Sequence, residues 1–396
     1  MRFNYVAVFG GITLLVLPFL LSALGASSWM LGTLIGALLT LCFLLVRGAS
    51  QKLKTSRIIF VYILLAGNIA GTSVYYQQIP SPVQIGAALI VGILLVFSEL
   101  LGSTLERLSY AQLRRYSTWL VCSMLLCSVI AIATDIKFVP FQKSILYFSE
   151  PSHFALAISP FVLYVIMTSD VVLSHFILLM ILVLSLALEN VTLLLVFLLT
   201  ALILLVRVGR GVYIRALFLA LLAVAIGITA LSQQYFLDRL TLDRTNLSSL
   251  VYLRGIEAAG ATLSRPPFIG VGFQMMASRA PVTLAVEQLD AFDQGTLNAN
   301  DGGFVAAKII TEFGWIGLFV MLYLLSCIVP ALYSSVLMVS QGKAMKDDCL
   351  FIACSLSVMI QLFIRGSGYL GPFLVLTYLA YGFMPSTGWF RLRQFS

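Results

Sequence analysis

The sequence contains little charge and almost no histidine. Only 10% of its 396 residues are charged, 2 are histidines and 60% are hydrophobic, and the mean hydropathy is +1.03. An ordinary globular domain carries about 25% charged residues, so a soluble chain of this composition would not cover its surface with polar groups. The composition therefore excludes a soluble enzyme, a nucleic-acid-binding module and a disordered chain, and it predicts an integral membrane protein.

Sequence motifs for metals and nucleotides are also lacking. The six cysteines fall in apolar runs or at the ends of such runs: Cys42, Cys122, Cys127, Cys327, Cys349 and Cys354. Neither a disulfide framework nor a zinc pattern follows from their spacing. No glycine-rich phosphate loop is present. We therefore expect no metal, no cofactor and no nucleic-acid partner.

Apolar runs that are long enough to cross a membrane recur along the whole chain. A transmembrane helix needs about 20 apolar residues. The predicted spans are 4–25, 29–46, 58–76, 82–101, 117–134, 154–168, 171–188, 191–206, 214–231, 304–337, 349–365 and 369–386. The first run is longer than the apolar core of a signal peptide, which favours an uncleaved span. The fold class predicted is an all-α, polytopic membrane protein with about 12 transmembrane helices.

Two details of these runs carry further expectations. The short polar breaks at 169–170 and 189–190 must act as tight turns, because lipid-exposed backbone has to stay helical. The run 304–337 is too long for one simple crossing and must include an extension that enters the membrane.

The basic residues determine the predicted side of each loop. Most of the 24 fall on alternate loops, at Arg2, Arg47, Lys52, Lys54, Arg57, Arg107, Arg114, Arg115, Arg207, Arg210, Arg215, Lys343, Lys346, Arg391 and Arg393. The intervening short loops 23–28 and 77–81 have none. Since Lys and Arg are retained on the cytoplasmic side, both termini are predicted to be cytoplasmic.

One long loop interrupts this pattern and divides the chain into spans 1–231, a loop 232–303 and spans 304–396. A structureless loop of that length is improbable in a compact protein, so we expect it to be partly helical and functional. Apolar residues recur at helical spacing between Leu250 and Leu263, which predicts an amphipathic helix over 248–263. Ser248 or Ser249 is the predicted cap, and Pro266 ends the helix.

Three arginines on this loop are candidates for binding an anion. Arg254, Arg265 and Arg279 each present a planar fork of donors that fits phosphate oxygens and stays charged at any physiological pH. Together they could hold a diphosphate at the membrane surface. The alternative is that they pair with acidic residues of the same loop or with lipid headgroups.

Three residues on the predicted external side are candidates for proton transfer. Glu150 and His153 lie just before a span, and Asp301 lies where the long loop re-enters the membrane. Each could accept a proton from an attacking hydroxyl. The alternative for each is a helix-capping role. Within the next span, Lys308 and Glu312 stand four residues apart and predict an internal ion pair.

The arrangement of three segments resembles the O-antigen polymerase and ligase superfamily. Residues 254–272 read RGIEAAGATLSRPPFIGVG and are similar to the large-loop signature, an Arg opening a helix followed by a Pro-rich turn closing in Gly-Val-Gly. Residues 309–317, IITEFGWIG, resemble the Glu-x-Gly-x-x-Gly helix that follows the loop. Residues 148–154, FSEPSHF, are similar to a Phe-x-Glu-Pro-Ser element of the polymerase branch.

The resemblance implies a metal-independent, GT-C-like membrane glycosyltransferase of the bacterial inner membrane. Its substrates would be undecaprenyl-diphosphate-linked glycans, polymerised at the periplasmic face, and Arg254 would lie on the donor diphosphate. Ligases of the superfamily carry histidine where the long loop meets the next span. Here that place reads NDGGF, which favours a polymerase over a ligase. A ligase and a flippase for the same lipids remain the alternatives, and a chain-length regulator and a flippase are the implied protein partners.

Overall fold

The computed structural model describes residues 29–46, 55–134, 148, 150–207, 234–366 and 368–385. Every regular element in these ranges is an α-helix, and no strand is found among them. The all-α prediction is therefore confirmed for the described part of the chain. The predicted spans 4–25 and 214–231 lie outside it.

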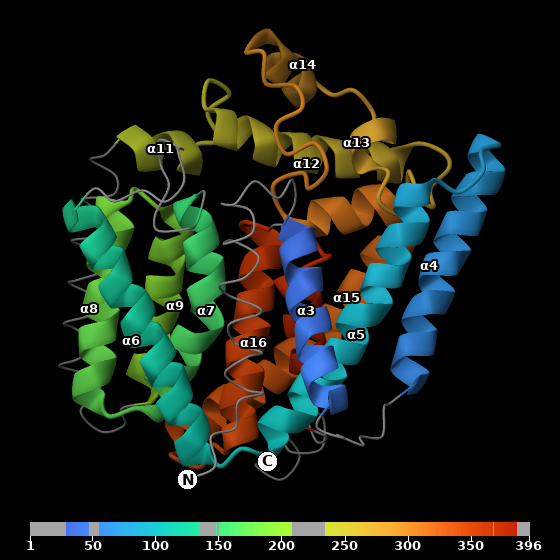
Figure 1. Ribbon diagram of the computed structural model, residues 1–396. Helices are drawn as coiled ribbons and strands as arrows, with labels where there is room; N and C mark the ends of the chain where they lie inside the picture. Colours follow the sequence, from blue (N-terminus) through green and yellow to red (C-terminus); the bar gives the residue numbers. More distant parts are fainter. Residues whose placement is uncertain are drawn as a thin grey trace, which may run out of the picture.

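The body of the molecule is a bundle of helices that run side by side (Figure 1). Its members are α3 (Trp29–Val46), α4 (Thr55–Tyr76), α5 (Pro82–Arg107), α6 (Tyr110–Thr134), α7 (Pro151–Thr168), α8 (Val171–Ala187), α9 (Val191–Arg207), α15 (Val305–Ser340), α16 (Lys346–Phe363) and α17 (Pro372–Phe383). Each coincides with one of the predicted apolar runs. Helices α4, α5, α6, α7 and α15 are long and apolar enough to cross a membrane, and four shorter apolar helices accompany them. The full number of about 12 spans stays a prediction.

The polar breaks of the apolar runs form the tight turns that the sequence predicts. Helix α7 ends at Thr168 and α8 begins at Val171, where the Asp170 side chain accepts a hydrogen bond from the Leu173 N–H at 2.9 Å. Asn190 caps α9 in the same way, accepting from the Leu193 N–H at 3.1 Å. A short polar side chain at each break thus satisfies an otherwise unpaired N–H group of the next helix.

Helix α7 lies in the interior of the bundle, between α6, α9 and α16. Phe154, Val162 and Tyr164 on this helix are almost fully buried. A helix that is apolar on every face is suited to such a position, since protein surrounds it on all sides.

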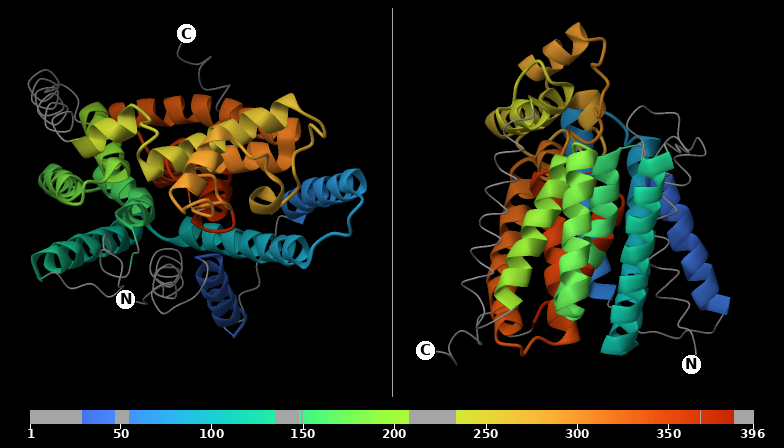
Figure 2. Two further views of the ribbon diagram at one scale, coloured as in Figure 1. Left: turned by 90° about the horizontal axis from the view of Figure 1, so that it is seen from above. Right: turned by 90° about the vertical axis from the view of Figure 1, so that its left-hand side faces the viewer.

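A layer of helices from the long loop covers one end of the bundle (Figures 1 and 2). It consists of α11 (Gln234–Leu240), α12 (Leu247–Ser264), α13 (Met276–Arg279) and α14 (Leu284–Ala291), and α14 projects furthest from the bundle. The expectation that loop 232–303 is partly helical is confirmed, and α12 coincides with the predicted helix 248–263 within one residue at each end.

The predicted cap of this helix was wrong. Asn246, not Ser248 or Ser249, is the N-cap of α12, and its side-chain oxygen accepts from the N–H groups of both serines at 3.0 and 3.4 Å. The two serines therefore belong to the first helical turn. Asn and Ser are both favourable N-cap residues, so the sequence alone does not distinguish Asn246 from the two serines.

Helix α15 is broken at Gly314, whose φ is +58° and ψ is −136°. In Figure 1 the part before the break lies against the layer, beneath α12, and the part after it runs down the bundle. This break accounts for the unusual length of the apolar run 304–337. The short helical arm before Gly314 is the extra part of this run, and its entry into the membrane stays a prediction.

Contacts at the opposite end of the bundle join loops that the basic residues predict to lie on one side. Arg207 donates to the carbonyls of Ile166 and Ser169, and Arg114 donates to the carbonyl of Thr168. Cationic side chains thus satisfy the free carbonyls at the carboxyl end of α7. The basic residues of this end have a structural role as well as a predicted topological one.

Candidate functional site

The candidate site begins where two sequence segments, 268–274 and 311–315, fold against each other. The Val271 N–H donates to the Thr311 carbonyl at 2.9 Å, and the Gly272 N–H donates to the Glu312 carbonyl at 3.1 Å. A third backbone bond joins the Trp315 N–H to the Phe268 carbonyl at 2.9 Å. The loop after α12 therefore docks on the break in α15, where helical hydrogen bonding is interrupted and carbonyls are available.

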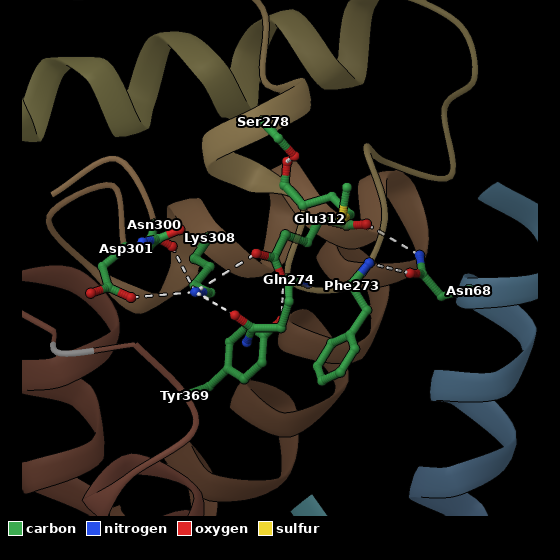
Figure 3. Close-up of polar contacts among 10 residues, drawn as sticks. Asn68, Phe273, Gln274, Ser278, Asn300, Asp301, Lys308, Glu312 and Tyr369 are labelled. Atoms are coloured by element: carbon green, nitrogen blue, oxygen red, sulfur yellow. Dashed lines mark hydrogen bonds and ion pairs between the residues drawn. The ribbon is translucent and has the colours of Figure 1, made fainter. Parts of the chain in front are cut away.

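Asn68, a polar residue in the middle of α4, fastens this junction to the bundle. Its side-chain N–H groups donate to the carbonyls of Ile269 and Glu312, both at 3.1 Å, and its side-chain oxygen accepts from the Phe273 N–H at 2.8 Å. The side chain is buried, so these bonds are made away from water. The Asn68 side chain therefore hydrogen-bonds to both segments of the junction, and Figure 3 shows some of these bonds.

A buried lysine stands at the centre of the site (Figure 3). The Lys308 Nζ contacts the Asn300 carbonyl at 2.6 Å, Asp301 Oδ1 at 3.3 Å, Gln274 Oε1 at 3.5 Å and Glu312 Oε1 at 3.7 Å. It also lies 5.1 Å from the centre of the Tyr369 ring. Its side chain is only 3% exposed. A lysine ammonium is tolerated at such depth only when carboxylates and other oxygens replace its hydration shell.

Glu312 forms the innermost part of this cluster. Its side chain is fully buried, and Oε2 accepts from the Gln274 N–H at 2.8 Å and from the Tyr369 hydroxyl. The internal ion pair predicted between Lys308 and Glu312 is confirmed. The sequence spacing did not reveal that Asp301 shares the same lysine.

Asp301 forms the outer part of the cluster. Its side chain is 34% exposed and pairs with Lys308. The capping alternative for Asp301 is excluded, because the N-cap of α15 is Phe304, which makes no side-chain capping bond. A Cβ atom added at Gly368 would lie 2.5 Å from Asp301 Oδ1, so the carboxylate rests against bare backbone. Asp301 is thus held on one side and open to water on the other.

Glu150 pairs with Arg365, which is not one of the three candidate arginines of the long loop. Its Oε2 accepts from Arg365 at 2.7 Å and from the Ser152 hydroxyl at 2.9 Å, and the His153 Nε2 lies 4.0 Å away. Burial alone would raise the pKa of the Glu150 carboxyl, but Arg365, His153 and Ser152 together hold that pKa below its ordinary value. Glu150 is the N-cap residue of α7, although its side chain makes no capping bond.

Glu150 and Asp301 contact opposite ends of the short connection between α16 and α17. Arg365, which pairs with Glu150, and Gly368, which contacts Asp301, both belong to the link between α16 and α17. Backbone positions three residues apart are separated by at most about 11 Å. The fold therefore brings Glu150, His153 and Asp301 to one end of the bundle, beneath the layer α11–α14.

The three candidate arginines are not gathered in one place by any contact among the described residues. Arg254 is buried, and its Nη1 donates to the carbonyls of Gly295 at 2.8 Å and Leu297 at 3.4 Å. Burial lowers the pKa of the Arg254 guanidinium, and the nearby Asp290 offsets part of this effect. In this structure Arg254 braces the chain that leads to Asp301.

Arg279 and Arg265 occupy different environments. Arg279 donates to Gln78 and to the Val271 carbonyl at 3.4 Å, and its guanidinium lies 4.7 Å from the centre of the Tyr76 ring. Arg265 is exposed at the carboxyl end of α12, and its side chain makes no ion pair or hydrogen bond within the described ranges. Eleven residues separate it from Arg254, which is about 16 Å along a helix.

Sequence reasoning missed Asn68, Gln274 and Tyr369. A signal existed for Asn68, because a polar side chain inside an apolar run needs a partner. Gln274 and Tyr369 carry no such signal, since neither residue type is unusual at its position. Among the described residues, no group of three or more His, Cys, Asp or Glu side chains could hold a metal ion.

Comparison with known proteins identifies no relative: no family model, no curated protein and no solved structure matches the chain.

Proposed function

We propose that this protein is a membrane glycosyltransferase that polymerises undecaprenyl-diphosphate-linked repeat units, as an O-antigen polymerase does. The observation that carries the proposal is the junction of segments 268–274 and 311–315. These overlap two of the three segments whose sequences resemble the superfamily, and backbone bonds join them beside a cluster of buried charged side chains. Buried ionisable side chains within an apolar span are functional candidates by default.

The reaction transfers a glycan between two lipid-linked substrates. The non-reducing-end hydroxyl of one repeat unit attacks the anomeric carbon of the first sugar of the growing chain and displaces undecaprenyl diphosphate. Fixed cations that neutralise the leaving diphosphate act directly on the transition state. The lipid diphosphate itself supplies the driving energy, so no nucleotide is required.

Roles are assigned to the candidate residues by their chemistry. Arg254, with Arg265 or Arg279, neutralises the diphosphate. Exposed Arg265 can reach a ligand without breaking any contact described above, whereas Arg254 would have to exchange its carbonyl partners for phosphate oxygens. Glu150, Asp301 and His153 are the candidates for the base that accepts the hydroxyl proton.

The proposal includes a location and partners. The protein would lie in the bacterial inner membrane with both termini in the cytoplasm, and the layer α11–α14 would face the periplasm. Apolar surfaces of the spans would contact lipid bilayer and polyprenyl tails. A chain-length regulator and a flippase would act beside it in the same pathway.

Deleting the gene and separating the surface lipopolysaccharide on a gel tests the proposal. Loss of a polymerase leaves lipid core carrying a single repeat unit. Loss of a ligase leaves bare core while polymerised lipid-linked glycan accumulates, and loss of a flippase leaves bare core with unpolymerised lipid-linked units. A normal ladder in the deletion strain would refute the proposal.

Complementation with variants then tests the arginine assignment. Wild-type protein and Lys343→Met, a change at an exposed lysine between α15 and α16, should restore the ladder. Arg254→Ala at equal membrane abundance should not. An undiminished ladder with Arg254→Ala would remove this residue from the diphosphate site.

A further inference from the structure

Two consecutive residues of the loop before α15, Asn300 and Asp301, bind the Lys308 ammonium. The ammonium binds the backbone carbonyl of Asn300 at 2.6 Å and the side chain of Asp301 at 3.3 Å. One cation therefore fixes both the path of the chain and the orientation of the carboxylate it carries. Glu312, fully buried on the other side, supplies the opposite charge that keeps the ammonium at this depth.

Lys308 itself is poorly placed to contact a substrate. Its side chain is 3% exposed, and the oxygens of Asn300, Asp301, Gln274 and Glu312 surround its Nζ. Any influence on a reaction at the surface must pass through a neighbour. The only partner in this set with a substantially exposed charged group is Asp301, whose side chain is 34% exposed.

The competing carboxylate, Glu150, is engaged by more groups than Asp301. Arg365 and Ser152 both bond its Oε2, and His153 stands 4.0 Å from the same atom. Proton transfer to Glu150 would weaken these three contacts, whereas proton transfer to Asp301 would weaken the one contact with Lys308.

We infer that Lys308 is a positioning residue, which holds the Asp301 carboxylate in place as the base of the glycosyl transfer. This inference rests on the proposed function. In the step, the acceptor O–H bond breaks and its proton passes to Asp301, while the oxygen forms the new bond to the anomeric carbon. The bond from that carbon to the diphosphate oxygen breaks, and the lipid diphosphate leaves with the electron pair. Asp301 then releases its proton to water.

Steady-state kinetics of the full-length protein in proteoliposomes, with a synthetic undecaprenyl-diphosphate-linked repeat unit as substrate, test the inference. Asp301→Asn should lower kcat by about 100-fold or more, the contribution of a well-placed base. Lys308→Met should lower kcat by about 10-fold or more, with KM nearly unchanged, because a small misplacement of a reacting group costs rate more than binding. Lys343→Met serves as the matched lysine control and should leave both constants unchanged.

The decisive measurement is the double variant. If Lys308 acts only through Asp301, then adding Lys308→Met to Asp301→Asn should lower kcat by no further factor. A further loss equal to that of Lys308→Met alone would overturn the inference, and so would an unchanged kcat in the Lys308→Met single variant.

Two controls separate folding and function from this outcome. Lys308→Met leaves Glu312 buried without its cation, so the charge-neutral variant Lys308→Met/Glu312→Gln, with thermal unfolding measured in detergent, replaces it if the single variant does not fold. If wild-type protein forms no polymer in this assay, the proposed function fails. If wild type is active but Lys308→Met and Asp301→Asn lower kcat by independent factors in the double variant, only the role of Lys308 fails.

Discussion

Gly314 and Gly270 lie where the two segments of the junction, 268–274 and 311–315, pack backbone against backbone. A Cβ atom added at Gly314 would lie 1.9 Å from the Phe268 carbonyl oxygen, and one added at Gly270 would lie 2.3 Å from the Glu312 carbonyl oxygen. Both residues also have positive φ, at +58° and +88°. Only glycine meets the steric and the conformational requirement together. The junction beside Lys308 therefore requires glycine at both positions.

Gly314→Ala should destabilise the protein by at least about 1 kcal/mol, because the added methyl group requires backbone movement and an unfavourable φ. The measurement is thermal unfolding of the purified protein in detergent. Gly260→Ala is the matched control, since this glycine lies exposed within α12 with open space around it. The control should be unchanged or slightly more stable. Equal transitions for the two variants would contradict the account of the junction.

Arg254→Lys should loosen the chain between Gly295 and Leu297. Lysine keeps the charge, but its side chain is one atom shorter, so its Nζ does not reach the position from which Arg254 Nη1 bonds both carbonyls. We expect faster hydrogen exchange of the backbone amides in 293–301, measured by mass spectrometry. Arg265→Lys, a change at an exposed arginine, should leave exchange in that segment unaltered. If Arg254→Lys lowers activity without changing exchange, the bracing role of Arg254 is wrong and a direct role at the substrate is favoured.

At the scale of elements, α14 is attached to α12 through one carboxylate. Glu257 accepts from the Ala285 N–H at 2.9 Å, at the amino end of α14, and pairs with Arg244 at 3.0 Å. Arg244 in turn donates to Gln288 at 2.9 Å. A small apolar cluster of Leu250, Val251, Ala285 and Leu289 completes the contact. An eight-residue helix has little stability of its own, so its position depends on these contacts.

The attachment of α14 should weaken in acid. Burial raises the pKa of the Glu257 carboxyl, but the Ala285 N–H, Arg244 and Thr283 outweigh burial and lower that pKa below its ordinary value. A lowered pKa means that the stabilisation is complete above the ordinary carboxyl range and is lost as pH falls through the lowered value. Amide protection factors of α14, corrected for intrinsic exchange, should fall over that interval. Glu257→Gln should show low protection with no such pH dependence, and a parallel pH profile in both proteins would refute the prediction.

At the scale of the whole molecule, the two ends of the bundle differ in kind. One end carries the layer α11–α14 and the charge cluster, whereas the other is closed by cations on helix carbonyls. There the Lys346 Nζ donates to the carbonyls of Leu105, Glu106 and Leu108 at 2.7–3.0 Å. All the loop-to-loop contacts described above join loops that are predicted, from the basic residues, to lie on the same side of the membrane. The charge distribution alone predicts how these ends are oriented in a membrane.

Cysteine labelling measures that orientation. In a cysteine-free background, Asp293→Cys near the tip of the layer should react with a membrane-impermeant maleimide added to intact spheroplasts. Lys343→Cys at the opposite end should react only after the membrane is opened. Both positions are exposed, so accessibility within the protein does not limit either reaction. The reverse pattern would show that the predicted topology is inverted.

The sequence predicts the local structure well and the site only in part. Apolar runs and their breaks anticipate the helices, because these signals come from neighbouring residues. The Lys308–Glu312 pair was predictable for the same reason, since a helix brings residues four apart together. Asn68, which fastens segments more than 200 positions away, gave only the indication that it needed a partner.

The sequence by itself determined that the chain is helical, strongly apolar and divided by one long, partly helical loop. It also determined that the charge outside the predicted cytoplasmic loops is concentrated near that long loop. Only the tertiary structure decided which of those charges meet: Glu150 with Arg365, 215 positions apart, and Asp301 with Lys308 rather than at a helix cap. The physical reason is that hydrophobic periodicity acts between neighbours along the chain, whereas ion pairing depends on how loops and helices fold against one another.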